Sequence, residues 1–78
     1  MVTVRFFAAA KAAAGTSELA MELSSISDLI EQCAVVSQQL SAVISTCTFL
    51  VDGLAESDLE RDLVGALRID VLPKFAGG

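Results

Sequence analysis

The residue pair with the clearest chemical use stands at the end of the sequence, which closes in Gly77-Gly78. Without side chains, two terminal glycines are slender enough to enter a narrow channel, and the α-carboxylate of Gly78 is left unhindered. An unhindered carboxylate can be activated and attacked at its carbonyl carbon. Residues 74 to 78 span about 17 Å when extended, which is enough to reach a recessed site in a partner. The plain alternative is a frayed end without function.

Side chains offer little catalytic chemistry. The sequence has no His, which is the usual general base near neutral pH and the commonest metal ligand. Cys33 and Cys47 show no C-x-x-C spacing, and we interpret both as small buried hydrophobic residues. The acidic segment 56–62 lacks the glycine turn and ligand spacing of a calcium loop, so we interpret it as a solvated or partner-facing edge. We therefore expect no metal site and no bound cofactor.

Length and charge exclude further classes. The chain has 78 residues and a formal net charge of −5, which is enough for one small domain with a modest core. An acidic chain is a poor candidate for sequence-independent nucleic-acid binding, and we expect compensating Lys and Arg on the docking surfaces of its partners. It shows neither a secretory pattern nor an apolar run near the roughly 20 residues of a membrane span. We expect a soluble, cytoplasmic protein with no membrane partner.

The hydrophobic pattern predicts an α+β domain. Apolar residues that alternate with a period of two predict strands over 2–7, 18–23, 47–51 and 67–72, with a short returning strand at 54–55. The Asp52-Gly53 pair is a turn signal. The alanine-rich stretch 8–14, stopped by Gly15, predicts a two-turn helix. Helical spacing predicts one long amphipathic helix over about 26–39, while residues 40–44 are ambiguous.

This order of elements favours a β-grasp fold. We expect a mixed sheet of about four to five strands with the one long helix lying across it. In that arrangement the first and last strands pair in parallel at the centre, and Pro73 ends the last strand because it has no amide proton for the ladder. Residues 1–73 then form the β-grasp domain, and residues 74–78 form a flexible C-terminal tail that ends in Gly-Gly.

Three stretches of the sequence resemble the MoaD/ThiS family of ubiquitin-like sulfur carriers. They are Val2–Ala8 with the alanine-rich turn up to Gly15, the capped helix start Ser25–Ile30, and the ending Ile69–Gly78. Within the family, the sequence most resembles the small subunits of molybdopterin synthase. The resemblance covers essentially the whole chain, and its specificity lies in the two ends.

The resemblance implies a sulfur carrier for molybdenum cofactor biosynthesis. In the family, an ATP-using adenylyltransferase of the ubiquitin-activating type adenylates the terminal glycine, and a sulfurtransferase supplies the sulfur of a thiocarboxylate. The tail then enters the large synthase subunit, which performs catalysis and passes sulfur to cyclic pyranopterin monophosphate. This chain would be the non-catalytic sulfur donor. The residues implied are the carrier Gly78, the tail residues Gly77 and Ala76, and the partner-binding residues Phe7, Leu72 and Phe75.

The sequence departs from the family pattern at two places and leaves other functions open. Pro73-Lys74 stands where the family commonly has two prolines, so the tail should be less stiff. Residues 64–67 lack the Asp of the usual Gly-Asp turn. The alternatives are a carrier for thiazole (thiamine) or cysteine biosynthesis, and a ubiquitin-like modifier or β-grasp interaction module. For Phe7 and Phe75 the alternative role is simple packing.

Overall fold

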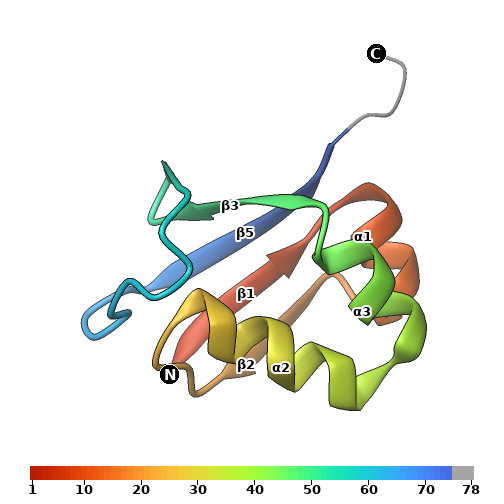
Figure 1. Cartoon of the computed structure of the whole chain (residues 1–78), viewed down its shortest axis with the longest axis horizontal. Coiled ribbons are helices and arrows are strands. Elements are labelled where there is room, and N and C mark those ends of the chain that lie inside the picture. Colours follow the sequence, from red (N-terminus) through yellow and green to blue (C-terminus); the bar gives the residue numbers. More distant parts are fainter. Residues whose placement is uncertain (75–78) are drawn as a thin grey trace.

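A five-stranded mixed sheet forms the frame of the molecule in the computed structural model, which describes residues 1–74 (Figure 1). The strand order is β2-β1-β5-β3-β4. The strands are β1 (Val2–Phe6), β2 (Glu18–Met21), β3 (Cys47–Val51), β4 (Leu54–Glu56) and β5 (Arg68–Pro73). The helices are α1 (Ala8–Ala14), α2 (Ile26–Val36) and α3 (Gln38–Ile44). The predicted α+β class and the five segments expected as strands are confirmed.

The first and last strands pair in parallel at the centre of the sheet, as the β-grasp prediction requires. Strand β5 lies between β1 and the antiparallel β3, while β2 and β4 form the two edges. In this register Asp70 of β5 stands opposite Arg5 of β1 on one side and opposite Leu50 of β3 on the other. The chain leaves the sheet at Pro73, the last residue of this central strand.

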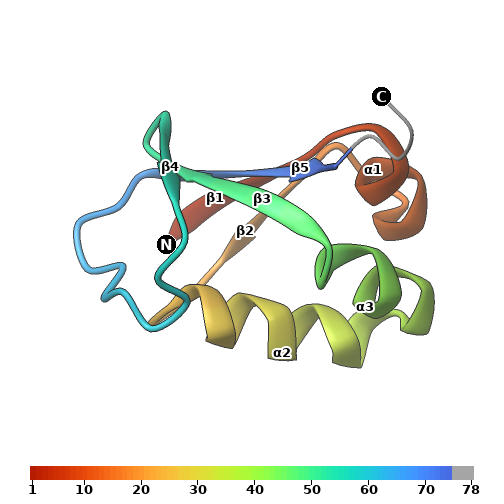
Figure 2. The same cartoon turned by 45° about the horizontal axis from the view of Figure 1, so that its top comes forward.

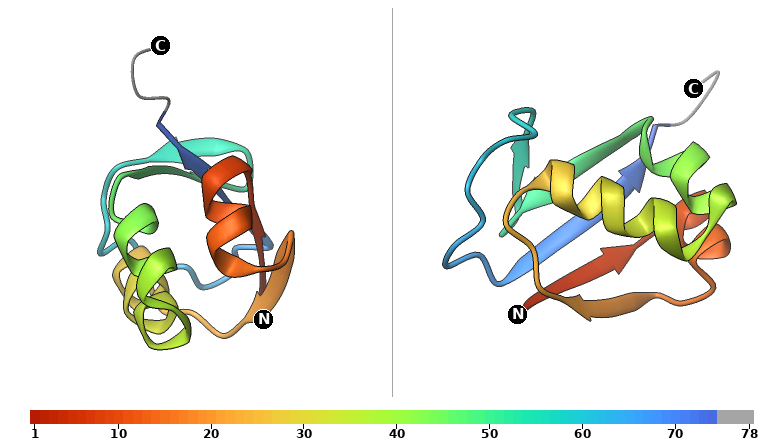
Figure 3. Two further views of the ribbon diagram at one scale, coloured as in Figure 1. Left: turned by 90° about the vertical axis from the view of Figure 1, so that its right-hand side faces the viewer. Right: turned by 60° about the horizontal axis from the view of Figure 1, so that its bottom comes forward.

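One face of the sheet is packed against α2 and α3, and the opposite face is covered by no helix of residues 1–74 (Figure 2). Strict alternation puts Val4 and Phe6 of β1 in the core. Ile69 and Val71 of β5 are buried there for the same reason. Helix α1 packs near the end of β5, close to the place where the chain leaves the sheet (Figure 3). We call the uncovered side the open face.

The prediction of one long helix over 26–39 is wrong. Helix α2 ends at Val36, Ser37 is extended (φ −159°, ψ 132°), and α3 begins at Gln38. Ser37 serves both helices, because its backbone N–H donates to the carbonyl of Cys33 and its Oγ accepts from the N–H of Leu40. Serine side chains readily satisfy the free N–H groups of a helix start, which favours a break at this residue.

Among residues 1–74, no helix combines the length and apolar character that crossing a bilayer requires.

The turns lie where the sequence predicts them, and the start of β5 differs from its prediction. Asp52 and Gly53 both have positive φ (50° and 88°), as expected of the tight hairpin turn between β3 and β4. Gly15 caps α1 at φ 76°. The predicted strand over 67–72 would put Leu67 on the same buried face as Ile69, whereas Leu67 is 76% exposed. It precedes the strand, and its N–H is held by the side chain of Asp52 instead of by the ladder.

Candidate functional site

The described structure ends at the root of the proposed tail. Phe75, Ala76, Gly77 and Gly78 lie outside the described residues, so their roles stay predictions. Lys74 is exposed and follows directly on Pro73, the last residue of the central strand. A protein that takes up the tail must therefore approach the molecule at this end of β5.

The two other residues implied in partner binding, Phe7 and Leu72, lie on the open face and are half-buried. Leu72 stands opposite Thr48 in the register and follows Asp70 on the same side of β5. Phe7 comes directly after β1 and continues the alternation of Thr3 and Arg5. Their position next to the root of the tail suits a docking surface, while their role in binding remains a prediction.

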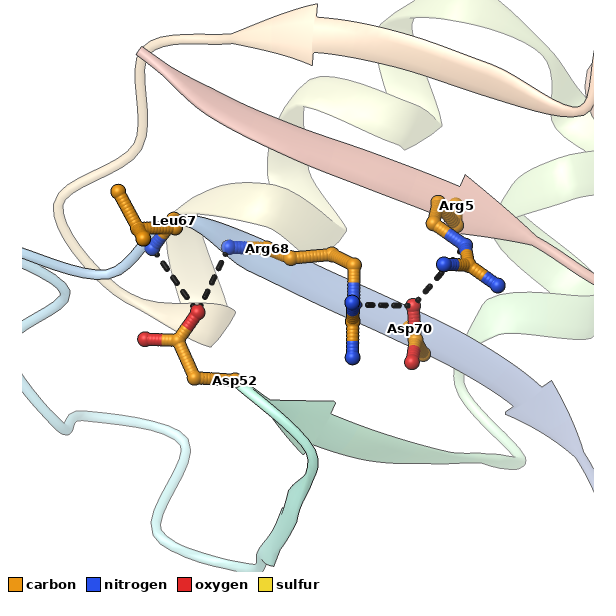
Figure 4. Close-up of polar contacts among 5 residues, drawn as sticks. All are labelled: Arg5, Asp52, Leu67, Arg68 and Asp70. Atoms are coloured by element: carbon orange, nitrogen blue, oxygen red, sulfur yellow. Dashed lines mark hydrogen bonds and ion pairs between the residues drawn. The ribbon is translucent and has the colours of Figure 1, made fainter.

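An ionic cluster that the sequence reading did not single out occupies the centre of the open face (Figure 4). The Oδ1 atom of Asp70 lies 3.4 Å from Nε of Arg5 and 3.3 Å from Nε of Arg68. The Asp70 side chain is only 9% exposed, whereas those of the two arginines are 40% and 42% exposed. Two cations and one anion leave a local excess of one positive charge. Solvent therefore meets guanidinium groups on this face more than the carboxylate between them.

Neither ion pair of this cluster is a well-formed hydrogen bond. Asp70 Oδ1 and Arg68 Nε are buried atoms without a hydrogen-bond partner among residues 1–74. Charge-assisted N–H···O bonds are normally about 2.7–2.9 Å long, and a guanidinium has five N–H donors. The arginines therefore retain most of their capacity to donate hydrogen bonds.

The side chains around the cluster orient it. The guanidinium carbon of Arg5 lies 5.2 Å from the centre of the Phe7 ring, a cation–π arrangement. At the start of β5, Asp52 Oδ1 accepts the backbone N–H groups of Leu67 (3.0 Å) and Arg68 (2.9 Å), as Figure 4 shows. Asp52 thereby fixes where β5 begins, and with it the position of Arg68.

The cysteines are buried, as predicted. Cys33 is 1% exposed in the core, and burial raises the pKa of its thiol to about 11. Cys47 is 9% exposed; burial raises the pKa of its thiol too, and that thiol donates to the carbonyl of Val43. A nucleophilic cysteine needs a lowered pKa and access, so neither thiol is prepared for chemistry. In the described part of the chain no group of three or more His, Cys, Asp or Glu could hold a metal ion.

A cleft of about 350 Å³ lies on the helix-covered side, between Ile30 of α2, Phe49 of β3 and Leu59 of the following loop. The charged side chains that line it are Glu56 and Lys74. No well-placed set of catalytic groups meets there, and the thiol of Cys47 on its wall has a raised pKa. The cleft offers space beside the tail root rather than a reaction centre.

The acidic segment uses its carboxylates to hold its own loop. Glu56 pairs with Arg61 at 3.2 Å, and the side chains of Asp58 and Asp62 accept backbone N–H groups two residues further on. Ser27 of α2 donates to Glu60 and so ties the loop to the helix. These carboxylates do not converge on a common point, in agreement with the interpretation of an exposed edge.

Comparisons with known proteins give the fold. The crystal structure of SAMP1 from Haloferax volcanii matches 99% of this chain and 98% of its own, with a TM-score of 0.75 and 18% identity. A protein–protein complex of subunits 1 and 2 of the molybdopterin-converting factor from Helicobacter pylori contains a chain that matches with a TM-score of 0.73 and 22% identity, over 99% of this chain and 97% of that one. This chain has the β-grasp fold. No model of a known protein family and no curated protein sequence matches it.

For this β-grasp domain the MoaD/ThiS resemblance is confirmed at the level of the fold. The family resemblance implied Phe7 and Leu72, which lie on the open face, and the sequence predictions missed Arg5, Arg68 and Asp70. A signal was present, because parallel pairing of the first and last strands brings their outward-facing residues together. Alternation places Arg5 outward in one strand and Asp70 outward in the other.

Proposed function

We propose that this chain is the sulfur carrier subunit of a molybdopterin synthase. The observation that supports it most is the position of the tail root, which follows the central strand of a β-grasp domain and lies a few residues before the Gly77-Gly78 ending. A carrier of this kind needs no side-chain catalyst, because the reacting group is a main-chain carboxylate. The thiols of Cys33 and Cys47 are buried and have raised pKa values, which agrees with a chain that contributes no side-chain nucleophile.

The proposed chemistry takes place at the carbonyl carbon of Gly78. An oxygen of the carboxylate attacks the α-phosphate of ATP on an activating enzyme, pyrophosphate leaves, and an acyl-adenylate forms. The terminal sulfur of a persulfide on a sulfurtransferase then displaces AMP and forms an acyl disulfide. A second thiol of that enzyme attacks the enzyme-side sulfur, so that a disulfide forms on the enzyme and the thiocarboxylate leaves. In the large synthase subunit, that sulfur passes to cyclic pyranopterin monophosphate. The β-grasp domain contributes recognition and presents the tail; ATP belongs to the activating partner.

The first expected partner is the large subunit of the synthase. One of the similar structures is a complex of subunits 1 and 2 of a molybdopterin-converting factor, which supports a two-subunit assembly. The open face adjoins the tail root, so a partner seated there also receives the tail. The activating enzyme and the sulfurtransferase are inferred from the chemistry that Gly78 requires.

Intact-mass analysis of the chain purified from its native host tests the proposal. We expect a fraction in which one oxygen is replaced by sulfur, and we expect deletion of Gly78 to abolish it while leaving the fold intact, because a terminal residue outside the core contributes little stability. The control is fragmentation that assigns the added mass to the C-terminal peptide, because oxidation of a methionine or cysteine adds nearly the same mass as the replacement of oxygen by sulfur. A chain that stays entirely free acid with sulfur and the activating enzyme present contradicts the proposal.

A ubiquitin-like modifier is the second candidate, and the similarity to SAMP1 favours it. A modifier would use the same Gly78 carboxylate to form an amide bond with an amine of a target protein. Tryptic peptide mapping of host proteins separates the two candidates, since only a modifier leaves a Phe-Ala-Gly-Gly remnant, cut after Lys74, on target lysines. Co-purification of a thiazole synthase in place of a pterin synthase would instead assign the chain to the thiamine pathway.

A further inference from the structure

The Arg5–Asp70–Arg68 cluster on the open face carries a charge opposite to that of the whole molecule. The chain has a formal net charge of −5, yet the Arg5–Asp70–Arg68 cluster at the centre of this face has an excess of one positive charge. Glu18, opposite Arg5 at the edge strand β2, shares the face and forms no ion pair with Arg5 within residues 1–74. The net charge alone predicts basic partner surfaces, whereas the arginine cluster favours an acidic group of the partner at this one place.

The arginines of this cluster are exposed enough to meet a partner and are incompletely used within the molecule. Their contacts to Asp70 Oδ1 run through Nε at 3.3 and 3.4 Å, and no hydrogen bond among residues 1–74 involves the Nη atoms of either side chain. A second carboxylate placed against these Nη groups would complete an alternating arrangement of two cations and two anions. Arginine favours such pairing because its planar fork matches the geometry of a carboxylate.

Apolar side chains border the cluster on three sides. Leu50 stands opposite Asp70 on β3, Leu72 follows Asp70 on β5, and the ring of Phe7 lies beside the Arg5 guanidinium. All three are half-buried. When a partner covers such a border, water is excluded from the ion pairs and the attraction between the charges increases. An apolar rim around a charged centre also restricts which partner surfaces fit.

We propose that the open face binds a partner surface that inserts a carboxylate between Arg5 and Arg68, surrounded by apolar side chains that contact Phe7, Leu50 and Leu72. The inference rests on the proposed function, because this partner is the protein that receives the Gly78 tail, the large synthase subunit. The position of the face supports it, since Leu72 is two residues before Lys74, where the tail begins.

The first test measures binding of the full chain to the large synthase subunit of the same host by calorimetry. We expect Arg5→Gln and Arg68→Gln each to weaken binding by about tenfold or more, because hydrogen bonds between charged groups are the strong ones. The matched control is Arg61→Gln, which removes the same charge from the loop pair with Glu56 and should leave the affinity unchanged. Affinity that is unchanged or increased in Arg5→Gln and Arg68→Gln overturns the inference.

The second test does not depend on the proposed function. The 15N-labelled chain is titrated with the capped peptide Leu-Glu-Phe and with its Leu-Lys-Phe counterpart, while the Nε–H signals of Arg5 and Arg68 are followed by NMR. We expect shifts with the acidic peptide only. If these shifts occur but wild-type chain does not bind the large subunit, the proposed function fails and the carboxylate site stands.

Two results of the NMR experiment overturn the inference. One is the absence of a difference between the acidic and the basic peptide. The other is a shift of the arginine signals with protein concentration alone, because that would assign the face to the acidic loop of a second copy. Urea unfolding of each variant verifies that the chains compared are folded.

Discussion

Asp52 and Arg68 hold each other through two backbone-directed hydrogen bonds. The N–H of Arg68 donates to Oδ1 of Asp52 at 2.9 Å, and the N–H of Asp52 donates to the carbonyl of Arg68 at 2.9 Å. The pair joins the turn after β3 to the first residue of β5. It therefore sets the register of the central strand and the position of the arginine cluster on the open face.

Replacing Asp52 by Ala should lower the free energy of unfolding by about 1–3 kcal/mol, measured by urea denaturation. The change leaves the N–H groups of Leu67 and Arg68 without their acceptor, and it puts alanine at φ 50°, a region that Asp and Asn tolerate better. The control is Asp52→Asn, which keeps an acceptor oxygen and should retain most of the stability. Equal losses in the two variants would show that the acceptor is unimportant.

Ser37→Ala should cost about 1 kcal/mol of unfolding free energy, because the first turn of α3 loses its N-cap acceptor. Ser41 on the same helix provides the matched control, since its side chain makes no hydrogen bond in residues 1–74 and Ser41→Ala should be close to neutral. Chemical denaturation of the two variants under the same conditions gives the comparison. If Ser37→Ala is as stable as Ser41→Ala, the cap does not hold the break between α2 and α3.

The stability of the molecule should depend on the protonation of Asp28 in acid. The backbone N–H of Ser24, and next the side chain of Gln32, hold the pKa of this carboxyl below its usual value of 3.8. Because the pKa of Asp28 is lower in the folded than in the unfolded chain, its carboxylate stabilises the fold at pH values above the unfolded-state pKa. That stabilisation is lost as the pH falls through the folded-state pKa. Melting temperatures recorded below about pH 4 should therefore fall less steeply in Asp28→Asn than in wild type. Glu31→Gln, with the same loss of charge on α2, should follow the wild-type curve.

Both thiols should react slowly with an aromatic disulfide reagent at pH 8 while the chain is folded. With the pKa of Cys33 raised to about 11, only about one molecule in a thousand carries that thiolate at pH 8. Cys47 is the more exposed and should react first, which Cys33→Ala and Cys47→Ala variants distinguish. Both should react fully in denaturant. Rapid labelling of one thiol in the native chain would contradict the assignment of both as core residues.

The strands and turns of this fold could be predicted because their signals are local. Val2, Val4 and Phe6 show the buried face of β1 directly, and the residue types of Asp52-Gly53 mark the turn between β3 and β4. The break at Ser37 was missed, because serine is compatible with a helix interior and acts as a cap only once the backbone around it is extended. Leu67 was misassigned because its exposure depends on a hydrogen bond from a distant turn.

The candidate site was predictable only in part. The family resemblance implied Phe7 and Leu72, which the structure places on the open face, and the Gly-Gly ending pointed to the tail, whose residues 75–78 lie outside the described structure. The arginine cluster depends on the register between the first and last strands. That register follows from tertiary packing, so a local pattern shows that Arg5 and Asp70 face outward without showing that they meet.

The placement of β5 between two partner strands has a mechanical consequence. The slanted hydrogen bonds of the parallel ladder with β1 run along one side of it, and the perpendicular bonds of the antiparallel ladder with β3 run along the other. A pull exerted on Lys74 in the direction of the strand loads both ladders in shear, so many bonds must yield together instead of opening one after another. The central strand therefore anchors the chain against traction at its C-terminal end.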